Sequence, residues 1–133
     1  MRIVPKQDWR RERNLAKTLD ELLKIPGVAA AGEFAPDGKL VNYLASMDMS
    51  RDMAAMTAQF VATVTMLFNT LAGAFTQLSK MKWVPQQGWA YTGGDWTVAV
   101  MGNWGVFVET SKADFNLLFK ELGGKARVEP IPA

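Results

Sequence analysis

One stretch without any charged residue, Met53–Ser79, constrains this chain more than any other feature. Asp52 precedes it, and Lys80 and Lys82 follow it. An acid near the start and bases near the end suit the dipole of a helix. We therefore predict one long helix from Met49 to about Lys80. The surroundings of that helix decide whether the chain spans a membrane, buries the helix in its own core, or uses it to join subunits.

A helical wheel divides this uncharged segment into two faces and a narrow polar edge. The large-residue face consists of Met53, Met56, Phe60, Val64, Leu67, Leu71, Phe75 and Leu78. The small-residue face consists of Ala55, Ala58, Ala62, Thr65, Asn69, Ala72, Gly73 and Thr76. The polar edge between them holds Gln59, Thr63, Thr70 and Gln77.

Three environments are considered for this segment: a membrane, the core of the protein itself, and an interface between subunits. A membrane span needs about 20 mostly apolar residues, and the segment is long enough. It also carries five Thr, two Gln and one Asn, and a span here would divide the sheet predicted below, so we predict no membrane partner. A helix buried on one side only should carry charges on its other side, and this one has none.

Burial on both sides satisfies this pattern. We predict that the large-residue face packs on the protein's own sheet. The small-residue face then meets the same helix of a second subunit in a two-fold dimer, and its residues form the predicted interface. The alternative that stays open is a monomer whose long helix is covered by the two other helices.

Short elements surround the long helix. A first helix has a capping box from Thr18 to Glu21 and ends at Pro26-Gly27, and a last helix has one from Ser111 to Asp114 and ends at Gly123-Gly124. Alternating patterns and turn residues predict strands at Val28–Phe34, Leu40–Ala45, Trp89–Thr92, Trp96–Met101 and Val106–Thr110. The short connections favour an antiparallel sheet of about five strands with three helices, in the order αββαβββα. The fold class is therefore α+β.

The length of 133 residues suits one domain. We predict a basic N-terminal arm or helical extension over residues 1–17, the domain over 18–123, and a tail over 124–133. The N-terminus has no apolar stretch of the kind that a secretory signal requires, so a cytoplasmic location is expected.

The composition excludes several kinds of chemistry. The chain has no Cys and no His, which removes thiolate chemistry, the commonest general base and the commonest metal ligand. Glu33, Asp37 and Asp95 suit surface turns better than a catalytic pair. We predict no catalytic residue, no metal and no cofactor, and hence no enzyme.

Two features are candidates for binding a partner. Trp104, next to Asn103, is expected at a hairpin tip, where an exposed Trp would be an interface anchor. The alternative is that Trp104 folds back onto its own subunit. Arg10, Arg11 and Arg13 suit a solvated helix face or an acidic patch on a protein partner better than nucleic acid, because acidic residues dilute the charge and the net charge is only +2.

The sequence resembles roadblock-type (dynein light chain) domains. The resemblance rests on Leu22 to Val28, which reads LLKIPGV, and on the Asp37-Gly38 turn that follows. A closer resemblance is to an uncharacterised prokaryotic roadblock-like family, through Leu19–Tyr43, Thr92–Asp95, Gly102–Val108 and Asp114–Leu122. With the helix between these motifs, it covers about residues 18–123.

This resemblance implies a roadblock/profilin-like fold and a homodimer joined through the long helix and a neighbouring edge strand. It also implies a platform, since some such dimers bind small GTPases and others hold multi-protein complexes together. We therefore expect a non-enzymatic homodimeric scaffold or regulatory platform for a protein partner, a small GTPase or a metabolic complex. The alternative is a small-molecule-binding module with an apolar pocket between the sheet and the long helix.

Overall fold

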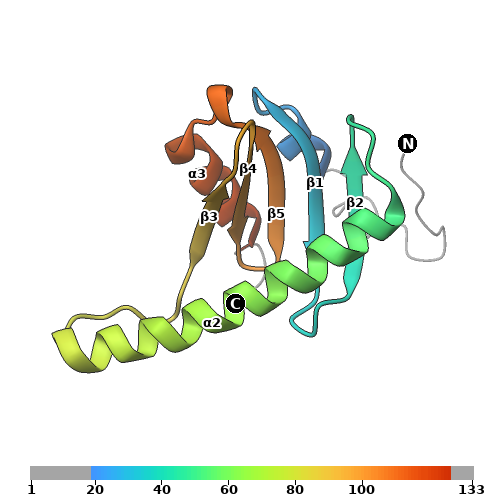
Figure 1. The fold of residues 1–133 in the computed structure, drawn as a ribbon. Helices are drawn as coiled ribbons and strands as arrows, with labels where there is room; N and C mark the ends of the chain where they lie inside the picture. The colour runs from blue at the N-terminus through green and yellow to red at the C-terminus, as the bar shows by residue number, and fades with distance from the viewer. Residues whose placement is uncertain (1–18, 127–133) are drawn as a thin grey trace, which may run out of the picture.

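A five-stranded antiparallel sheet forms the centre of the domain (Figure 1). The computed structural model describes residues 19–126, and their side chains as far as residue 123. The strands stand in the order β2-β1-β5-β4-β3 and comprise β1 Val28–Phe34, β2 Leu40–Ala45, β3 Gly88–Thr92, β4 Trp96–Met101 and β5 Trp104–Glu109. The helices are residues 19–23, α2 Arg51–Ser79 and α3 Phe115–Ala126, with a 3-10 turn at Thr110–Lys112.

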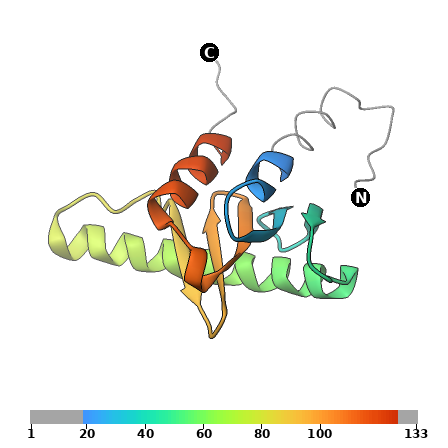
Figure 2. The same ribbon diagram turned by 90° about the horizontal axis from the view of Figure 1, so that it is seen from above.

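The elements form three layers (Figure 2). Residues 19–23 and α3 cover one face of the sheet, and α2 covers the other. On the first face, Leu19, Leu22, Leu118 and Leu122 are fully buried and form the larger core with the sheet. On the second face, Phe34 and Val100 pack against α2 in a smaller core. The predicted α+β fold class and the element order are thus confirmed.

Several predicted boundaries are wrong by a few residues. Trp104 belongs to β5, so the turn before it shortens to Gly102-Asn103 and the strand starts two residues earlier than predicted. Helix α3 is capped by the Asp114 carboxylate, which accepts the Leu117 N–H at 3.1 Å, and not by Ser111. It also continues through Gly123 to Ala126, because packing of its apolar face outweighs the weak helix propensity of glycine. The predicted Thr18 cap and the arm of residues 1–17 lie outside the described residues.

Helix α2 satisfies its own polar groups. Ser50 caps its start, as the Ser50 Oγ accepts the Met53 N–H at 3.1 Å, and Lys80 ends it with a left-handed φ of 65°. Threonine hydroxyls along the helix donate to the carbonyl four residues earlier, at 2.8 Å for Thr57 and 3.0 Å for Thr63. A hydroxyl that donates to its own helix does not need a hydrogen-bond acceptor from the surroundings. The helix therefore presents its surroundings with a largely apolar surface.

Helix α2 projects well beyond the sheet (Figure 1). Its 29 residues span about 43 Å, whereas five strands span about 24 Å. The first half lies across the sheet from β2 towards β3, and the second half continues past the β3 edge. A return loop, residues 80–87, runs back beside this overhang. It is held there by a 2.9 Å bond from the Trp83 N–H to the Thr76 hydroxyl and by contact of the Phe75 and Trp83 rings, whose centroids lie 4.8 Å apart.

Candidate protein-binding surface of helix α2 and strand β3

The small-residue face of α2 packs on the sheet in its first half and on the return loop in its second half. Ala58, Ala62 and Ala72 are each less than a tenth exposed within the subunit. Thr65 and Thr76 accept bonds from the Trp89 indole N–H and the Trp83 backbone N–H, while Ala55, Asn69 and Gly73 are exposed. The prediction that the large-residue face packs on the sheet is therefore wrong. Most of the predicted dimer interface is already covered by the subunit itself.

Side-chain size explains why the small-residue face, and not the large-residue face, is turned towards the sheet. Alanines let its backbone approach the strands closely. The β1–β2 turn comes so near that a Cβ on Gly38 would lie 3.4 Å from the Gln59 Cα and 3.8 Å from the Ala62 Cβ. Phe34, Val61 and Val100 fill the remaining space between the helix and the sheet. Larger side chains on this face would hold the helix away from the turn.

The large-residue face points away from the core. Phe60 is 63% exposed, Leu67 62% and Leu78 82%. Met56, Leu71 and Phe75 are also exposed, and Met53 and Val64 are half-buried. Isolated apolar side chains on a surface are ordinary, but a continuous uncharged row along a whole helix marks an interaction surface.

Two grooves run along the flank of α2 next to this face. The first, of about 320 Å³, lies between the helix and the sheet residues Trp89, Tyr91, Val98 and Phe107. The second, of about 470 Å³, lies between the overhang and the return loop. Both include Phe68 and Trp89, whose rings lie 5.8 Å apart, so they form one apolar trough beside the helix.

The edge strand β3 borders this trough and offers unpaired backbone groups. Two hydrogen bonds at the ends of its pairing with β4 show which residues bond to β4. The Gly93 N–H donates to the Trp96 carbonyl at 2.9 Å, and the Gly102 N–H donates to the Gln87 carbonyl at 3.2 Å. Antiparallel pairing alternates between bonded and non-bonded pairs, so Gly88, Ala90 and Thr92 direct their amides and carbonyls away from β4. An exposed edge of this kind is a template for another strand.

The opposite edge of the sheet, β2, is partly blocked. The Asn42 side-chain oxygen accepts the Tyr43 N–H at 2.9 Å. The Ser46 N–H donates to the Ala29 carbonyl, so every second residue of β2 from Ser46 bonds to β1. The amides of Tyr43 and Ala45 therefore point outward, away from β1. One outward donor of β2 is thus already used by a side chain. The β3 edge is therefore the better template of the two.

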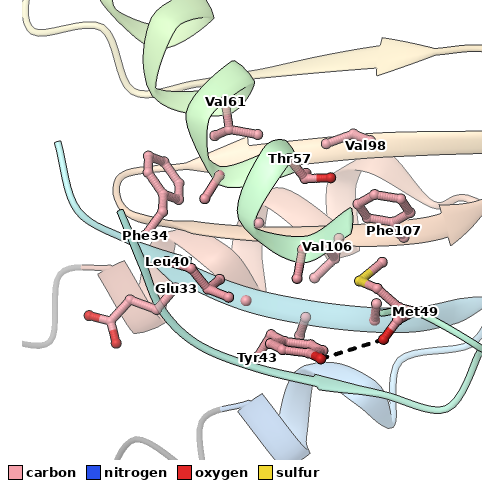
Figure 3. Close-up of a pocket in the computed structure, with 16 residues that line it drawn as sticks. Glu33, Phe34, Leu40, Tyr43, Met49, Thr57, Val61, Val98, Val106 and Phe107 are labelled. Atoms are coloured by element: carbon pink, nitrogen blue, oxygen red, sulfur yellow. Dashed lines mark hydrogen bonds between the residues drawn. The ribbon is translucent and has the colours of Figure 1, made fainter. Parts of the chain in front are cut away.

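A small apolar pocket lies under the first turns of α2 (Figure 3). Phe34, Val61, Val98 and Phe107 line it, and the Tyr43 hydroxyl beside it donates to the Met49 carbonyl at 3.4 Å. Its interior volume is about 50 Å³. Binding sites for drug-sized molecules and cofactors measure about 300–1,000 Å³. This pocket is therefore too small for such a ligand, whereas the two grooves beside α2, of about 320 and 470 Å³, reach that size.

The remaining predicted site residues are not brought together. Trp104 is half-buried and packs against the larger core, and Asn103 next to it is exposed. Trp104 thus follows the predicted alternative of folding back onto its own subunit. Arg10, Arg11 and Arg13 lie outside the described residues. Within residues 19–126, no group of three or more acidic residues is placed to hold a metal ion.

The comparisons with known proteins identify the family. The family model described as "Uncharacterized conserved protein (DUF2173)" matches residues 18–124. The chain belongs to this family. A search of curated proteins found no match.

Solved structures similar to this DUF2173 chain are roadblock domains. The gliding protein MglB of Thermus thermophilus superimposes with a TM-score of 0.71 at 12% identity, over 95% of this chain and 90% of that one. A Roadblock/LC7 domain of Streptomyces avermitilis gives 0.68 at 14% identity, over 84% and 90%. MglB of Myxococcus xanthus gives 0.60 at 11% identity, over 83% and 86%. The chain therefore has the roadblock fold.

Proposed function

We propose that this protein is a non-enzymatic homodimeric platform for a protein partner in the cytoplasm. The observation that carries the proposal is the exposed large-residue face of α2, which extends past the open β3 edge without a charged residue. We propose that the interface lies on this face and on β3 rather than on the small-residue face. The similarity in fold to MglB, one structure of which is described as a tetrameric arrangement, supports self-association.

The overhang of α2 has the length that such a dimer needs. The estimated length of α2 exceeds the width of the sheet by about 19 Å, and its far end projects past β3 (Figure 1). A second sheet joined at β3 would provide a surface beneath this overhang. Two antiparallel α2 helices would then lie side by side, each in the trough of the other. Their Phe60 and Leu67 side chains, exposed in one subunit, would be buried.

The outward amides of β3 define the pairing. A two-fold axis at Ala90 pairs the largest number of residues in this five-residue strand. Ala90 then bonds with Ala90 of the second subunit, and Gly88 bonds with Thr92 of the second subunit. In the same register, Trp89 lies opposite Tyr91 of the second subunit on the α2 side of the sheet. Such aromatic cross-strand pairs stabilise a sheet.

Replacing Ala90 with Pro is expected to prevent this pairing and to shift the protein towards monomers. The Ala90 N–H faces away from β4, so proline removes no bond within the subunit. Ala45→Pro is the matched control, because Ala45 also directs its amide outward but lies on β2. Sedimentation equilibrium would compare the two variants. A dimer that survives Ala90→Pro, or one that Ala45→Pro disrupts instead, would place the strand contact elsewhere.

The partner class follows from the resemblance to roadblock domains, and a small GTPase is the first candidate. We expect this protein to co-elute with one of the small GTPases of its organism in gel filtration, in either the GDP state or the GTP-analogue state. The dimer would remain intact in the complex. If no GTPase co-elutes in either nucleotide state, a multi-protein metabolic complex becomes the leading partner class and the GTPase assignment is withdrawn.

A further inference from the structure

A concave site lies at the end of the sheet where β4 begins and β5 finishes (Figure 1). Its volume is about 420 Å³, and it is lined by Gly94, Asp95, Trp96, Glu109, Thr110 and Ser111. None of these residues belongs to α2 or β3, and none lines either groove of the trough. The proposed dimer therefore makes no use of this site, which is called here the end pocket.

Strand register and one backbone bond bring the lining residues of the end pocket together. The Thr110 N–H donates to the Asp95 carbonyl at 2.8 Å, so the 3-10 turn is held against the β3–β4 turn. Trp96 is paired directly with Glu109 between β4 and β5. Directly opposed residues place their side chains on the same face of a sheet. The half-buried Trp96 ring and the Glu109 carboxylate are therefore neighbours in the pocket.

The end pocket presents hydrogen-bond acceptors that the domain itself does not use. Asp95 is exposed, and within residues 19–126 neither its carboxylate nor the Ser111 hydroxyl makes a hydrogen bond. Glu109 pairs with Lys112 at 3.0 Å through one carboxylate oxygen, and these side chains are 43% and 60% exposed. An ion pair in contact with water contributes little, so Glu109 can share its charge with a second cation. Two carboxylates and one ammonium give the pocket a net negative charge.

An aromatic ring beside two carboxylates complements a guanidinium. The arginine side chain ends in a planar cation that stacks on an indole and donates two parallel hydrogen bonds to a carboxylate. Trp96 offers the ring, and Asp95 and Glu109 offer the carboxylates. A hard metal ion needs more oxygen ligands, and the described part of the chain has no group of three or more acidic residues placed to hold one. The end pocket therefore fits a planar organic cation.

We propose that the end pocket binds an arginine side chain of a protein partner. The guanidinium stacks on the Trp96 indole and donates hydrogen bonds to the Asp95 and Glu109 carboxylates. The pocket lies within one subunit, so arginine binding does not need the dimer. The inference rests on the proposed platform function only in taking a protein partner as the source of the arginine.

The test is a titration of the full chain with N-acetyl-arginine amide, followed at the Ser111 backbone amide by ¹⁵N NMR. A ligand of this size is expected to saturate the signal at concentrations on the order of millimolar. N-acetyl-citrulline amide has nearly the same shape without the charge and is expected to bind at least about tenfold more weakly. Asp95→Asn is expected to weaken arginine binding about fivefold, the most that an exposed ion pair contributes. Trp96→Leu is expected to weaken it similarly by removing the ring.

The controls separate the end pocket from other acidic residues and from the dimer. Asp48→Asn removes an exposed carboxylate near β2 and is expected to leave arginine binding unchanged. The Ala90→Pro monomer is expected to bind the arginine compound as the unmodified protein does, so failure of the dimer and failure of the pocket give different results. Because Asp95 is exposed, Asp95→Asn tests the pocket even where circular dichroism shows that Trp96→Leu disturbs the fold.

Three results overturn the proposal. The first is no binding of N-acetyl-arginine amide, or equal binding of the citrulline compound. The second is unchanged binding to the Asp95→Asn variant, because the proposed contact with this carboxylate would then be absent. The third is tighter binding of free arginine than of N-acetyl-arginine amide, which would assign the pocket to a free small molecule and withdraw the protein partner as the source of the arginine.

Discussion

Replacing Phe60 with Asp is expected to give a folded monomer. Phe60 is 63% exposed within one subunit, so a carboxylate there stays in water and the domain keeps its fold. In the proposed dimer the same carboxylate would be buried against an apolar helix. An unpaired buried charge costs about 3 kcal/mol or more, which weakens the dimer at least about 100-fold. Sedimentation equilibrium measures the loss, and circular dichroism confirms that the helices remain.

The control for Phe60→Asp is Val41→Asp. Val41 is 44% exposed, also apolar, and lies on β2 at the other edge of the sheet. We expect this variant to remain a dimer with an unchanged dissociation constant. If Phe60→Asp stays dimeric at the same concentrations as the unmodified protein, the large-residue face is not the interface. The proposed function would then need another surface for self-association.

Replacing Ala58 with Glu is expected to unfold the domain rather than dissociate it. Ala58 is 4% exposed and packs with Phe34, Val61 and Val100 between the helix and the sheet. A carboxylate at this position is buried without a partner, and the longer side chain also forces the helix away from the sheet. Together these effects should lower the free energy of unfolding by about 3–5 kcal/mol, a large part of the stability of a small domain.

The matched control is the neighbouring residue, because Gln59 is exposed. Gln59→Glu introduces the same side chain one position along and is expected to change the free energy of unfolding by less than about 0.5 kcal/mol. Urea denaturation at one fixed protein concentration would compare the two, since dimerisation makes stability depend on concentration. Similar destabilisation by both substitutions would contradict the orientation of α2 described above.

Local patterns predicted most of the secondary structure. The bounds of β1, β2 and β4 follow from alternation and from the Asp37-Gly38 and Gly94-Asp95 turns, because short turns have strong residue preferences. The start of β5 was not predictable, because Gly102 and Gly105 both resemble turn residues. Pairing of Trp104 with Met101 and Glu33 decides that Trp104 is in the strand.

The long helix was predicted as an element, but the face that packs on the sheet was predicted wrongly. The sequence of α2 contains two faces without charges, and each could face a protein surface. Hydrophobicity favours placing the larger side chains in the core. The close approach of the helix to the sheet and to the Gly38 turn reverses this choice, because only alanine-sized residues fit there. A wheel has no information on the distance between a helix and a sheet.

The sequence by itself determined that Met53–Ser79 is a long uncharged helix with two distinct faces, and that this helix belongs to an α+β domain of five strands. Those conclusions depend on periodicity, capping and turn residues, which act over a few neighbouring positions. Only the tertiary structure decided which face remains exposed and that half of the helix projects past β3. Both depend on how closely elements distant in sequence pack, and residue pattern along one helix does not specify that distance.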